Sequence, residues 1–337
     1  MSRTGCRISL LIVLLAGSCA LAALPPPEPS NSTDVIRVWG SAELQPLVER
    51  WEEGFKKNHL DAQFATHMAG SDSGLPGLYT RCADIAFLGR AATDAEVKAF
   101  QWIYLYQPSP IEVATGSLGA PGRSPALIVY VHSDNPLTRL TLAQLDAAFG
   151  CERLRGAPAN IRTWGQLGLT GEWRDRPIHI YAPDTEEGTG RFFRHVVLND
   201  SRMLDWEHLK EFTETKGRPA THDAGRKIIA ALAVDPLGLA VAGAGLDDVH
   251  VKPLALAEDA NGPFIPATRE NLIARTYPLT RAVFAYVNRA PGSPLDAKVR
   301  EFLAYVLSRE GQDEIKRDNA YLPLNAALIR AQQDALK

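Results

Sequence analysis

The sequence contains few of the residues that build disulfide frameworks and metal sites. It has 4 cysteines and 8 histidines in 337 residues. No two cysteines form a C-x-x-C pair, and no two histidines show the H-x3–5-H spacing that is typical of zinc ligands. We therefore expect no metal site, and none of the motifs in the chain indicates a cofactor.

Runs of positive charge are also absent. The 36 lysines and arginines are balanced by 39 aspartates and glutamates, and no block of about five or more basic residues occurs. Proteins that bind nucleic acids or anionic membranes concentrate positive charge on one surface, so neither partner is expected. With 45% hydrophobic and 22% charged residues, the composition is typical of a folded globular protein, and the length favours two domains.

The N-terminus departs most strongly from an average composition. Arg3 and Arg7 precede or flank the apolar run at 8–16, and a small-x-small site follows it. A basic start, a short apolar core and such a site are typical of a secretory signal peptide, and the core is too short to span a membrane. We expect residues 1–22 to be removed on export to the periplasm or the cell exterior, leaving Ala23 as the N-terminus. A retained N-terminal helix is the alternative.

Cys19 offers a second processing site. It ends a small-residue run at 15–19 that resembles a bacterial lipidation site, although alanine stands where leucine is usual, so a lipid anchor at Cys19 stays open. Residues 23–33 are proline-rich and predict an extended tether before the folded part. The folded part then contains Cys82 and Cys151. Export permits a disulfide between them, and two buried thiols are the alternative.

The mature chain alternates strand-like and helix-like segments. Apolar runs at 35–39 and 84–88 indicate strands, and an amphipathic pattern predicts a helix over 44–57. Further on, residues 126–131 give a strong buried-strand signal, and residues 142–149 predict another helix. Repeated strand-loop-helix units predict an α/β fold with ligands at the carboxyl ends of the strands.

Two loops between a strand and a helix are rich in small residues. One reads GSDSG at 70–74, and the other reads PDTEEGTG at 183–190. A loop of this kind aims free backbone N–H groups at an anion, because a helix N-terminus carries about half a positive charge. The second loop also contains Glu186 and Glu187, whose negative charges oppose a bound anion.

Several interpretations of these polar residues stay open. The two glutamates can cap the following helix, since carboxylates are favourable near a helix N-terminus. They can also pair with Arg90, Arg191 or Arg194, or contact a cationic or amine-bearing ligand. Ser71 and Ser73 can be simple helix caps. Arg90 can be solvated or ion-paired instead of bound to a ligand.

The order of these motifs resembles the substrate-binding subunits of phosphate ABC importers over about residues 34–325. The resemblance implies a two-lobed type II periplasmic-binding-protein fold of the α/β class with two interdomain crossovers. It predicts one lobe from residues 34–118 plus 270–337 and the other from residues 119–269. The matching segments are Gly40-Ser41, Pro46-Leu47, Trp51, the 70–74 loop, residues 83–86, residues 142–149, Thr163-Trp164, Gly188-Thr189, Phe192-Phe193, residues 277–279, Phe302-Leu303, Gly311-Gln312 and residues 321–324.

In that family, Ser/Thr hydroxyls, backbone N–H groups and an arginine hold a desolvated oxyanion, and some members add an acidic acceptor. The ligand-binding residues implied here are Ser41, Ser71, Ser73, Arg90, Glu187, Gly188 and Thr189.

This chain departs from the pattern of the family at four places. The serine of the family before Gly-Thr is Glu187, its arginine falls at Pro183, its threonine falls at Ala42-Glu43, and Gly89 takes the acidic position. Two unit charges about 4 Å apart interact by roughly 4 kcal/mol at an effective dielectric near 20. An ionised glutamate facing a phosphate would cancel several hydrogen bonds, so we expect weak phosphate binding.

The resemblance implies an extracytoplasmic solute-binding protein, a monomer without catalytic residues, that binds phosphate or another small oxyanion. Its partners would be that small-molecule ligand and an ABC permease. A sensor or scaffold that binds a different ligand without transport is the first alternative. An exported hydrolase is the second, although the sequence lacks a G-x-S-x-G nucleophile elbow.

Overall fold

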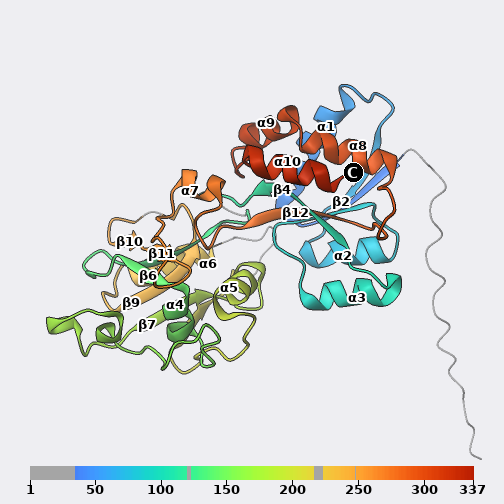
Figure 1. Cartoon of the computed structure of the whole chain (residues 1–337). Helices are drawn as coiled ribbons and strands as arrows, with labels where there is room; N and C mark the ends of the chain where they lie inside the picture. Colours follow the sequence, from blue (N-terminus) through green and yellow to red (C-terminus); the bar gives the residue numbers. More distant parts are fainter. Residues whose placement is uncertain (1–34, 120–122, 216–222, 247) are drawn as a thin grey trace, which may run out of the picture.

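The computed structural model describes residues 35–119, 123–215, 223–246 and 248–337. These residues form two halves, each built on its own five-stranded sheet (Figure 1). The sheet of the first half has the order β2-β1-β3-β12-β4, and that of the second half has the order β10-β5-β9-β7-β8. The predicted leader and tether lie outside the described residues.

The strands of the first sheet come from both ends of the described chain. β1 pairs in parallel with β2 and β3, whereas β12 pairs antiparallel with β3 and β4. The chain therefore leaves this half after β4 and later returns to place β12 in the sheet. The bounds are Val35–Gly40 for β1, Gln63–His67 for β2, Ile85–Leu88 for β3, Ser109–Thr115 for β4 and Ala282–Val287 for β12.

Helices cover both faces of the first sheet. α1, α8, α9 and α10 lie on one face, and α2 and α3 lie on the other (Figure 1). The apolar stripe of α1 buries Leu47, Trp51 and Phe55, each of which stabilises the fold by about 1.5–3 kcal/mol or more. The bounds are Gln45–Lys56 for α1, Ser71–Tyr79 for α2, Asp94–Tyr104 for α3, Ala297–Val306 for α8, Arg309–Asp318 for α9 and Ala326–Ala335 for α10, with a 3-10 turn, η1, at Ala42–Leu44.

The second sheet is mixed, with β5 antiparallel to β9 and β10, and β7 parallel to β8 and β9. Its core includes the fully buried rings of Phe149, Trp164 and Phe193. The strands are β5 Leu127–His132, β6 Arg139–Thr141, β7 His179–Pro183, β8 Leu209–Phe212, β9 Gly238–Gly243, β10 Val251–Pro253 and β11 Ala255–Ala257. The helices are α4 Leu142–Phe149, α5 Gly188–Leu198, α6 Ala224–Leu232 and α7 Arg269–Ala274, with 3-10 turns η2 at Trp164–Leu167 and η3 at Gly171–Trp173.

Two segments connect the halves and run side by side. One links β4 to β5, and the other leads from α7 to β12. The N–H of Gly116 donates to the carbonyl of Arg281 at 2.8 Å, and the N–H of Leu127 donates to the carbonyl of Leu279 at 3.1 Å. Because Arg281 directly precedes β12, it lies where the chain re-enters the first half.

The lobe boundaries expected from the sequence stay a prediction. They assign residues 270–337 to the first lobe, together with residues 34–118. In the structure, the side chains of Leu272 and Tyr277 pack in the core of the second half, and the pairing of β12 with the first sheet begins at Ala282. The connecting segment before β12 therefore belongs to the second half by its packing.

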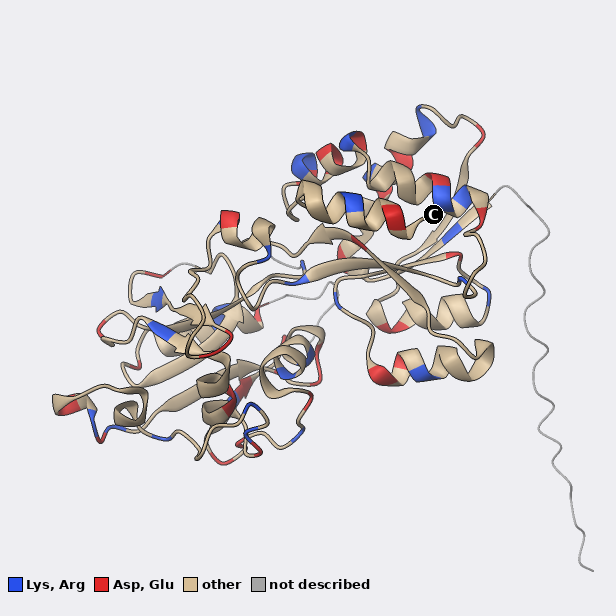
Figure 2. Cartoon of the chain, viewed as in Figure 1, with Lys and Arg blue, Asp and Glu red and all other residues tan. Residues whose placement is uncertain are grey.

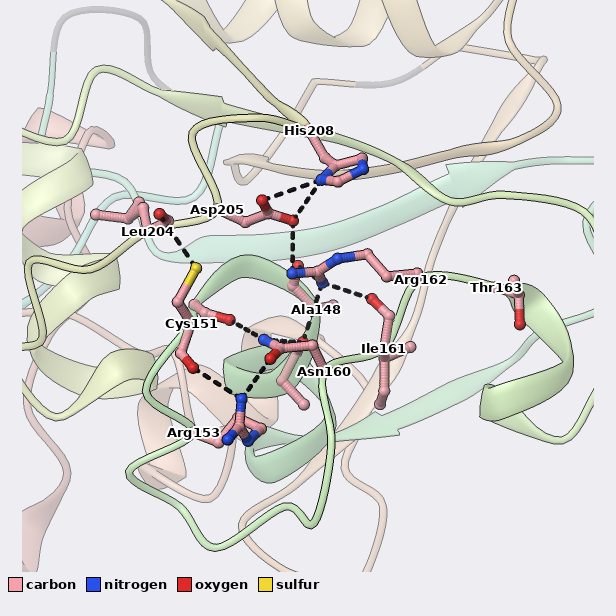
Figure 3. Close-up of polar contacts among 12 residues, drawn as sticks. Ala148, Cys151, Arg153, Asn160, Ile161, Arg162, Thr163, Leu204, Asp205 and His208 are labelled. Atoms are coloured by element: carbon pink, nitrogen blue, oxygen red, sulfur yellow. Dashed lines mark hydrogen bonds and ion pairs between the residues drawn. The ribbon is translucent and has the colours of Figure 1, made fainter.

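A polar network around the buried Asp205 holds the loop after α4 against the segment before β8 (Figure 3). Asp205 Oδ2 lies 2.7 Å from Arg162 Nη2 and 2.9 Å from His208 Nδ1. Asp205 is buried, whereas Arg162 and His208 are partly exposed, so the loss of either partner costs less than the roughly 3–5 kcal/mol that is typical of a fully buried ion pair. The network therefore has a structural role within the second half.

Both cysteines of the described chain are free thiols. The Cys151 thiol donates to the carbonyl of Leu204 at 3.5 Å within the network of Figure 3, whereas the Cys82 thiol lies 3.9 Å from the carbonyl of Thr80 in the first half. The disulfide that the sequence left open is not formed in the structure.

Charged residues of both signs are interspersed along the ribbon of both halves (Figure 2). This distribution fits a sequence that lacks basic runs. Within the described ranges, no helix combines the length and the apolar character that crossing a bilayer requires.

Candidate functional site

Ser41 follows β1 and is held by a close approach of two strands. Gly40 has a φ of 152°, which favours glycine, and a Cβ at this position would lie 2.0 Å from the carbonyl oxygen of Phe87. The N–H of Ser41 donates to the same carbonyl at 2.9 Å. The hydroxyl of the fully buried Ser41 lies 2.6 Å from Ser71 Oγ, and it accepts the N–H of Gly89 at 3.3 Å.

Ser71 and Ser73 lie in the first turn of α2. The N–H of Gly70 donates to the carbonyl of Gly40 at 2.9 Å, which fixes the start of this helix beside β1. Ser73 Oγ donates to the carbonyl of Gly70 at 2.7 Å, so its hydroxyl is used within the turn. The Ser71 hydroxyl instead forms a hydrogen bond with the Ser41 hydroxyl. Ser71 itself lies at the positive end of the α2 dipole.

α5 brings the second loop to the same region. Glu187 is the N-cap of α5, and its side chain makes no capping hydrogen bond to the helix. Gly188 and Thr189 are the first helical residues. Arg191, in the first turn of α5, lies 3.6 Å from Asp72 Oδ1 in the first turn of α2. The N-termini of the two helices therefore meet, one from each half.

Arg90 lies in an ion-pair network on the first half. Its guanidinium is 2.7 Å from Glu96 Oε2 and 3.0 Å from Asp72 Oδ1. Burial opposes the charge of Arg90, but these two carboxylates outweigh that effect and raise the pKa of Arg90 above its ordinary value. Of the alternatives that the sequence leaves open for Arg90, this geometry corresponds to ion pairing.

Arg281, which no sequence motif singled out, connects the two sides of the site. Its Nη2 donates to the carbonyl of Gly89 at 2.7 Å, and its Nη1 donates to Thr189 Oγ1 at 3.4 Å. Arg281 is only 3% exposed, and its Nε has no hydrogen-bond partner in the described part of the chain. Burial lowers the pKa of Arg281 to about 10, although nearby Glu43 acts in the opposite direction.

Glu43 lies beside the same group. Its Oε1 accepts a hydrogen bond from Ser124 Oγ at 3.1 Å, and its backbone carbonyl accepts one from Arg123 Nη1. A Cβ on Gly89 would lie 3.0 Å from Glu43 Oε1 and 1.8 Å from Ser124 Oγ. The absence of a side chain at Gly89 therefore makes room for Glu43 and Ser124.

A cavity of about 470 Å³ opens beside Thr189 in the second half. This volume falls within the range of about 300–1,000 Å³ that is usual for small-molecule sites. Its wall combines apolar residues of α6 and β9 with charged side chains of both signs. The charged residues of the wall are Arg123, Arg226, Glu187, Glu214 and Asp248.

The arrangement offers hydrogen-bond donors from three sources. These are the paired hydroxyls of Ser41 and Ser71, the first turns of two helices, and the guanidinium of Arg281. Backbone N–H groups at helix N-termini and guanidinium groups are the donors that proteins use to bind anions. Among the described residues, no group of three or more His, Cys, Asp or Glu side chains could hold a metal ion.

A model of the PBP superfamily domain matches residues 26–310 of the chain. The chain belongs to the PBP superfamily. This assignment confirms the resemblance proposed from the sequence motifs. It also confirms that the protein is not an enzyme, so the hydrolase alternative is set aside.

Two named proteins align with nearly the whole chain. The phosphate-binding protein PstS of Pseudomonas aeruginosa is 30% identical over 333 residues, which are 97% of this chain and 96% of that protein. The protein SphX of Synechococcus elongatus is 24% identical and covers 95% of this chain and 86% of its own length.

Solved structures share the fold at lower identity. PstS from Borrelia burgdorferi has a TM-score of 0.60 and 16% identity, over 87% of this chain and 100% of that chain. An ABC-type phosphate transport receptor from Vibrio cholerae has a TM-score of 0.55 and 20% identity, over 85% and 99% of the two chains. These similarities confirm the predicted two-lobed α/β periplasmic-binding-protein fold.

Proposed function

We propose that this protein is an extracytoplasmic solute-binding protein that holds phosphate or another small oxyanion between its two halves for ABC import. The observation that carries the proposal is the meeting of the first turns of α2 and α5, one from each half, with donor groups around them. Each helix N-terminus supplies partial positive charge and free N–H groups. An anion placed there would contact both halves at once.

The names of the relatives support the same ligand class. Relatives that align with nearly the whole chain include proteins named phosphate-binding protein PstS. One solved structure with 18% identity and a TM-score of 0.51 is described as a phosphate ABC transporter substrate-binding protein with bound phosphate. We propose Ser41, Ser71, Gly188 and Thr189 as ligand-binding residues.

We propose that three residues of the predicted site do not bind the anion directly. Ser73 stabilises the first turn of α2 through its bond to Gly70, and Arg90 positions Asp72 through an ion pair. Glu187 contributes negative charge on the cavity wall and weakens the binding of phosphate.

We also propose that residues 1–22 direct export to the periplasm or the cell exterior, with a lipid anchor at Cys19 as an alternative form of attachment. The mature protein would act as a monomer with an ABC permease as its partner. Unchanged phosphate uptake in a deletion strain, together with phosphate binding by the purified protein, would assign it to the sensor or scaffold alternative.

A thermal-shift screen of the mature protein tests the ligand class. The panel contains phosphate, arsenate, sulfate and small amines, each over a wide concentration range. A ligand at 100 times its Kd adds about 2.7 kcal/mol to the free energy of unfolding, which raises the Tm by several degrees. We expect at least one oxyanion, and no amine, to raise the Tm. A screen in which no oxyanion raises the Tm contradicts the proposal.

A further inference from the structure

We infer that Arg281 is the residue that supplies the positive charge for the bound anion, from the segment that connects the two halves. This inference rests on the proposed function and names the charged partner of the ligand. It concerns a residue that lies outside both small-residue loops and directly before β12.

The position of Arg281 brings its guanidinium to both sides of the site. The carbonyl of Gly89, which accepts from Nη2 at 2.7 Å, belongs to the same residue whose N–H donates to Ser41 Oγ at 3.3 Å. Ser41 in turn bonds to Ser71 at the start of α2. On the other side, Nη1 of Arg281 lies 3.4 Å from Thr189 Oγ1 at the start of α5.

The charge of Arg281 is buried without a direct counter-charge. Among the described residues, no carboxylate oxygen lies within 4.0 Å of its guanidinium, in contrast to Arg90, which has two carboxylates at 3.0 Å or less. Glu43 acts on Arg281 through space, while its own Oε1 accepts from Ser124 Oγ. A buried charge that no carboxylate pairs with is costly, so an ion of opposite sign that binds beside Arg281 would be favoured.

The guanidinium also has unused donor capacity. Arginine carries five N–H donors in a planar fork, and the two bonds of Arg281 leave Nε without a partner in the described structure. Charge-assisted bonds from such a fork to an oxyanion are stronger than bonds between neutral groups. The long bond of 3.4 Å to Thr189 Oγ1 is the weaker of the two, so a ligand oxygen could replace it at little cost.

This role explains how the site can bind an anion although it departs from the family pattern. Pro183 stands where the resemblance places an arginine, and Arg281 would provide that charge from another element. A buried guanidinium also repels a cation, so the contact of Glu187 with an amine-bearing ligand, which the sequence left open, is disfavoured.

Calorimetric titrations of the mature protein with inorganic phosphate test the inference. The variants are Arg281→Gln, which keeps a polar side chain, and Arg281→Lys, which keeps the charge but loses the fork. We expect the Kd to rise by at least about 100-fold for Arg281→Gln and by about tenfold for Arg281→Lys. Arg176→Gln is the control for net charge, since Arg176 pairs with Glu172 on the surface of the second half, and it should change the Kd by less than about twofold.

Thermal unfolding without added anion separates a ligand-binding role from a structural one. If Arg281 binds the ligand, Arg281→Met removes a buried charge that no carboxylate pairs with, and the Tm without anion should stay equal or rise. If Arg281 has only a structural role, Arg281→Met should lower the Tm without anion. The folded Arg281→Lys and Arg281→Gln variants should then bind phosphate with the affinity of the wild type. Wild-type affinity in Arg281→Gln overturns this inference alone, whereas a wild-type protein that binds no oxyanion overturns the proposed function as well.

Discussion

Replacing Glu187 by serine measures how the loop before α5 limits phosphate affinity. Glu187 is the N-cap of α5, makes no capping bond to the helix and is exposed at the wall of the cavity. Serine is a preferred N-cap residue, because its hydroxyl can accept a hydrogen bond from a backbone N–H of the first turn. The substitution removes one negative charge and places a small hydroxyl at the positive end of the helix.

The expected magnitude follows from the exposure of this carboxylate. Two unit charges about 4 Å apart interact by roughly 4 kcal/mol at an effective dielectric of 20, and by about 1 kcal/mol in water. Because Glu187 is exposed, its repulsion of a bound phosphate lies toward the lower value. We use about 1.4 kcal/mol, which corresponds to a tenfold change in Kd. Glu187→Ser should therefore bind phosphate about tenfold more tightly than the wild type.

Calorimetric titration with phosphate at neutral pH and low salt measures this difference. Glu186→Ser is the matched control, because it makes the same charge change one residue away, where the carboxylate pairs with Arg194 at 3.0 Å. We expect the control to change the Kd by less than about threefold. The gain from Glu187→Ser should shrink between about 0.01 M and 1 M salt, as the Debye length falls from about 30 Å to 3 Å. A Glu187→Ser variant that binds phosphate no better than the wild type refutes the reasoning.

Three further predictions concern stability and export. Gly40→Ala should lower the free energy of unfolding by about 1–3 kcal/mol or more in urea titrations, because the added Cβ would lie 2.0 Å from the carbonyl oxygen of Phe87; an unchanged midpoint contradicts this. Burial opposes ionisation of Asp84, but the hydrogen bonds and charge of Arg37 prevail and lower the pKa of Asp84. Asp84 then contributes stability above about pH 3.9, and this contribution is lost as the pH falls through the lower pKa of the folded state. Asp84→Asn should remove that part of the pH dependence of the free energy of unfolding in urea titrations. An identical pH dependence in the variant would exclude this role of Asp84. Mass spectrometry of the protein from its native host should find Ala23 at the N-terminus; an intact Met1 would exclude cleavage of any kind.

The elements that depend on local pattern could be predicted from the sequence. The apolar runs at 35–39 and 126–131 correspond to β1 and β5; alternate residues of β1 and all residues of β5 are buried. The helix predicted at 142–149 coincides with α4, and Thr141, which directly precedes it and is a preferred N-cap residue type, accepts the N–H of Gln144 at 3.1 Å. Periodicity and capping are properties of neighbouring residues, so a single sequence contains them.

The start of α2 shows where local pattern becomes insufficient. The loop predicted at 70–74 places the start of the next helix after Gly74, whereas α2 begins at Ser71. The extra turn consists of small and polar residues, and it is fixed by a bond from Gly70 to Gly40 on another element. The start of α2 therefore depends on a contact with the strand β1, and the apolar pattern of the sequence does not contain that contact.

Arg281 could not be found from the sequence for the same reason. Its two hydrogen-bond partners, Gly89 and Thr189, are 192 and 92 residues away in the chain. A single arginine before an apolar strand is an ordinary feature of a sequence, and only the fold shows that this one is buried without a carboxylate partner. The motif resemblance likewise directed attention to Arg90, whose ion pairs with Asp72 and Glu96 become visible only in three dimensions.

A crystal structure of the mature protein grown with a saturating concentration of phosphate tests the central claim most directly. The account predicts one phosphate between the first turns of α2 and α5, with the guanidinium of Arg281 and the hydroxyls of Ser71 and Thr189 within hydrogen-bond distance of its oxygens. Phosphate bound elsewhere, or no phosphate between these two helices, would contradict the account.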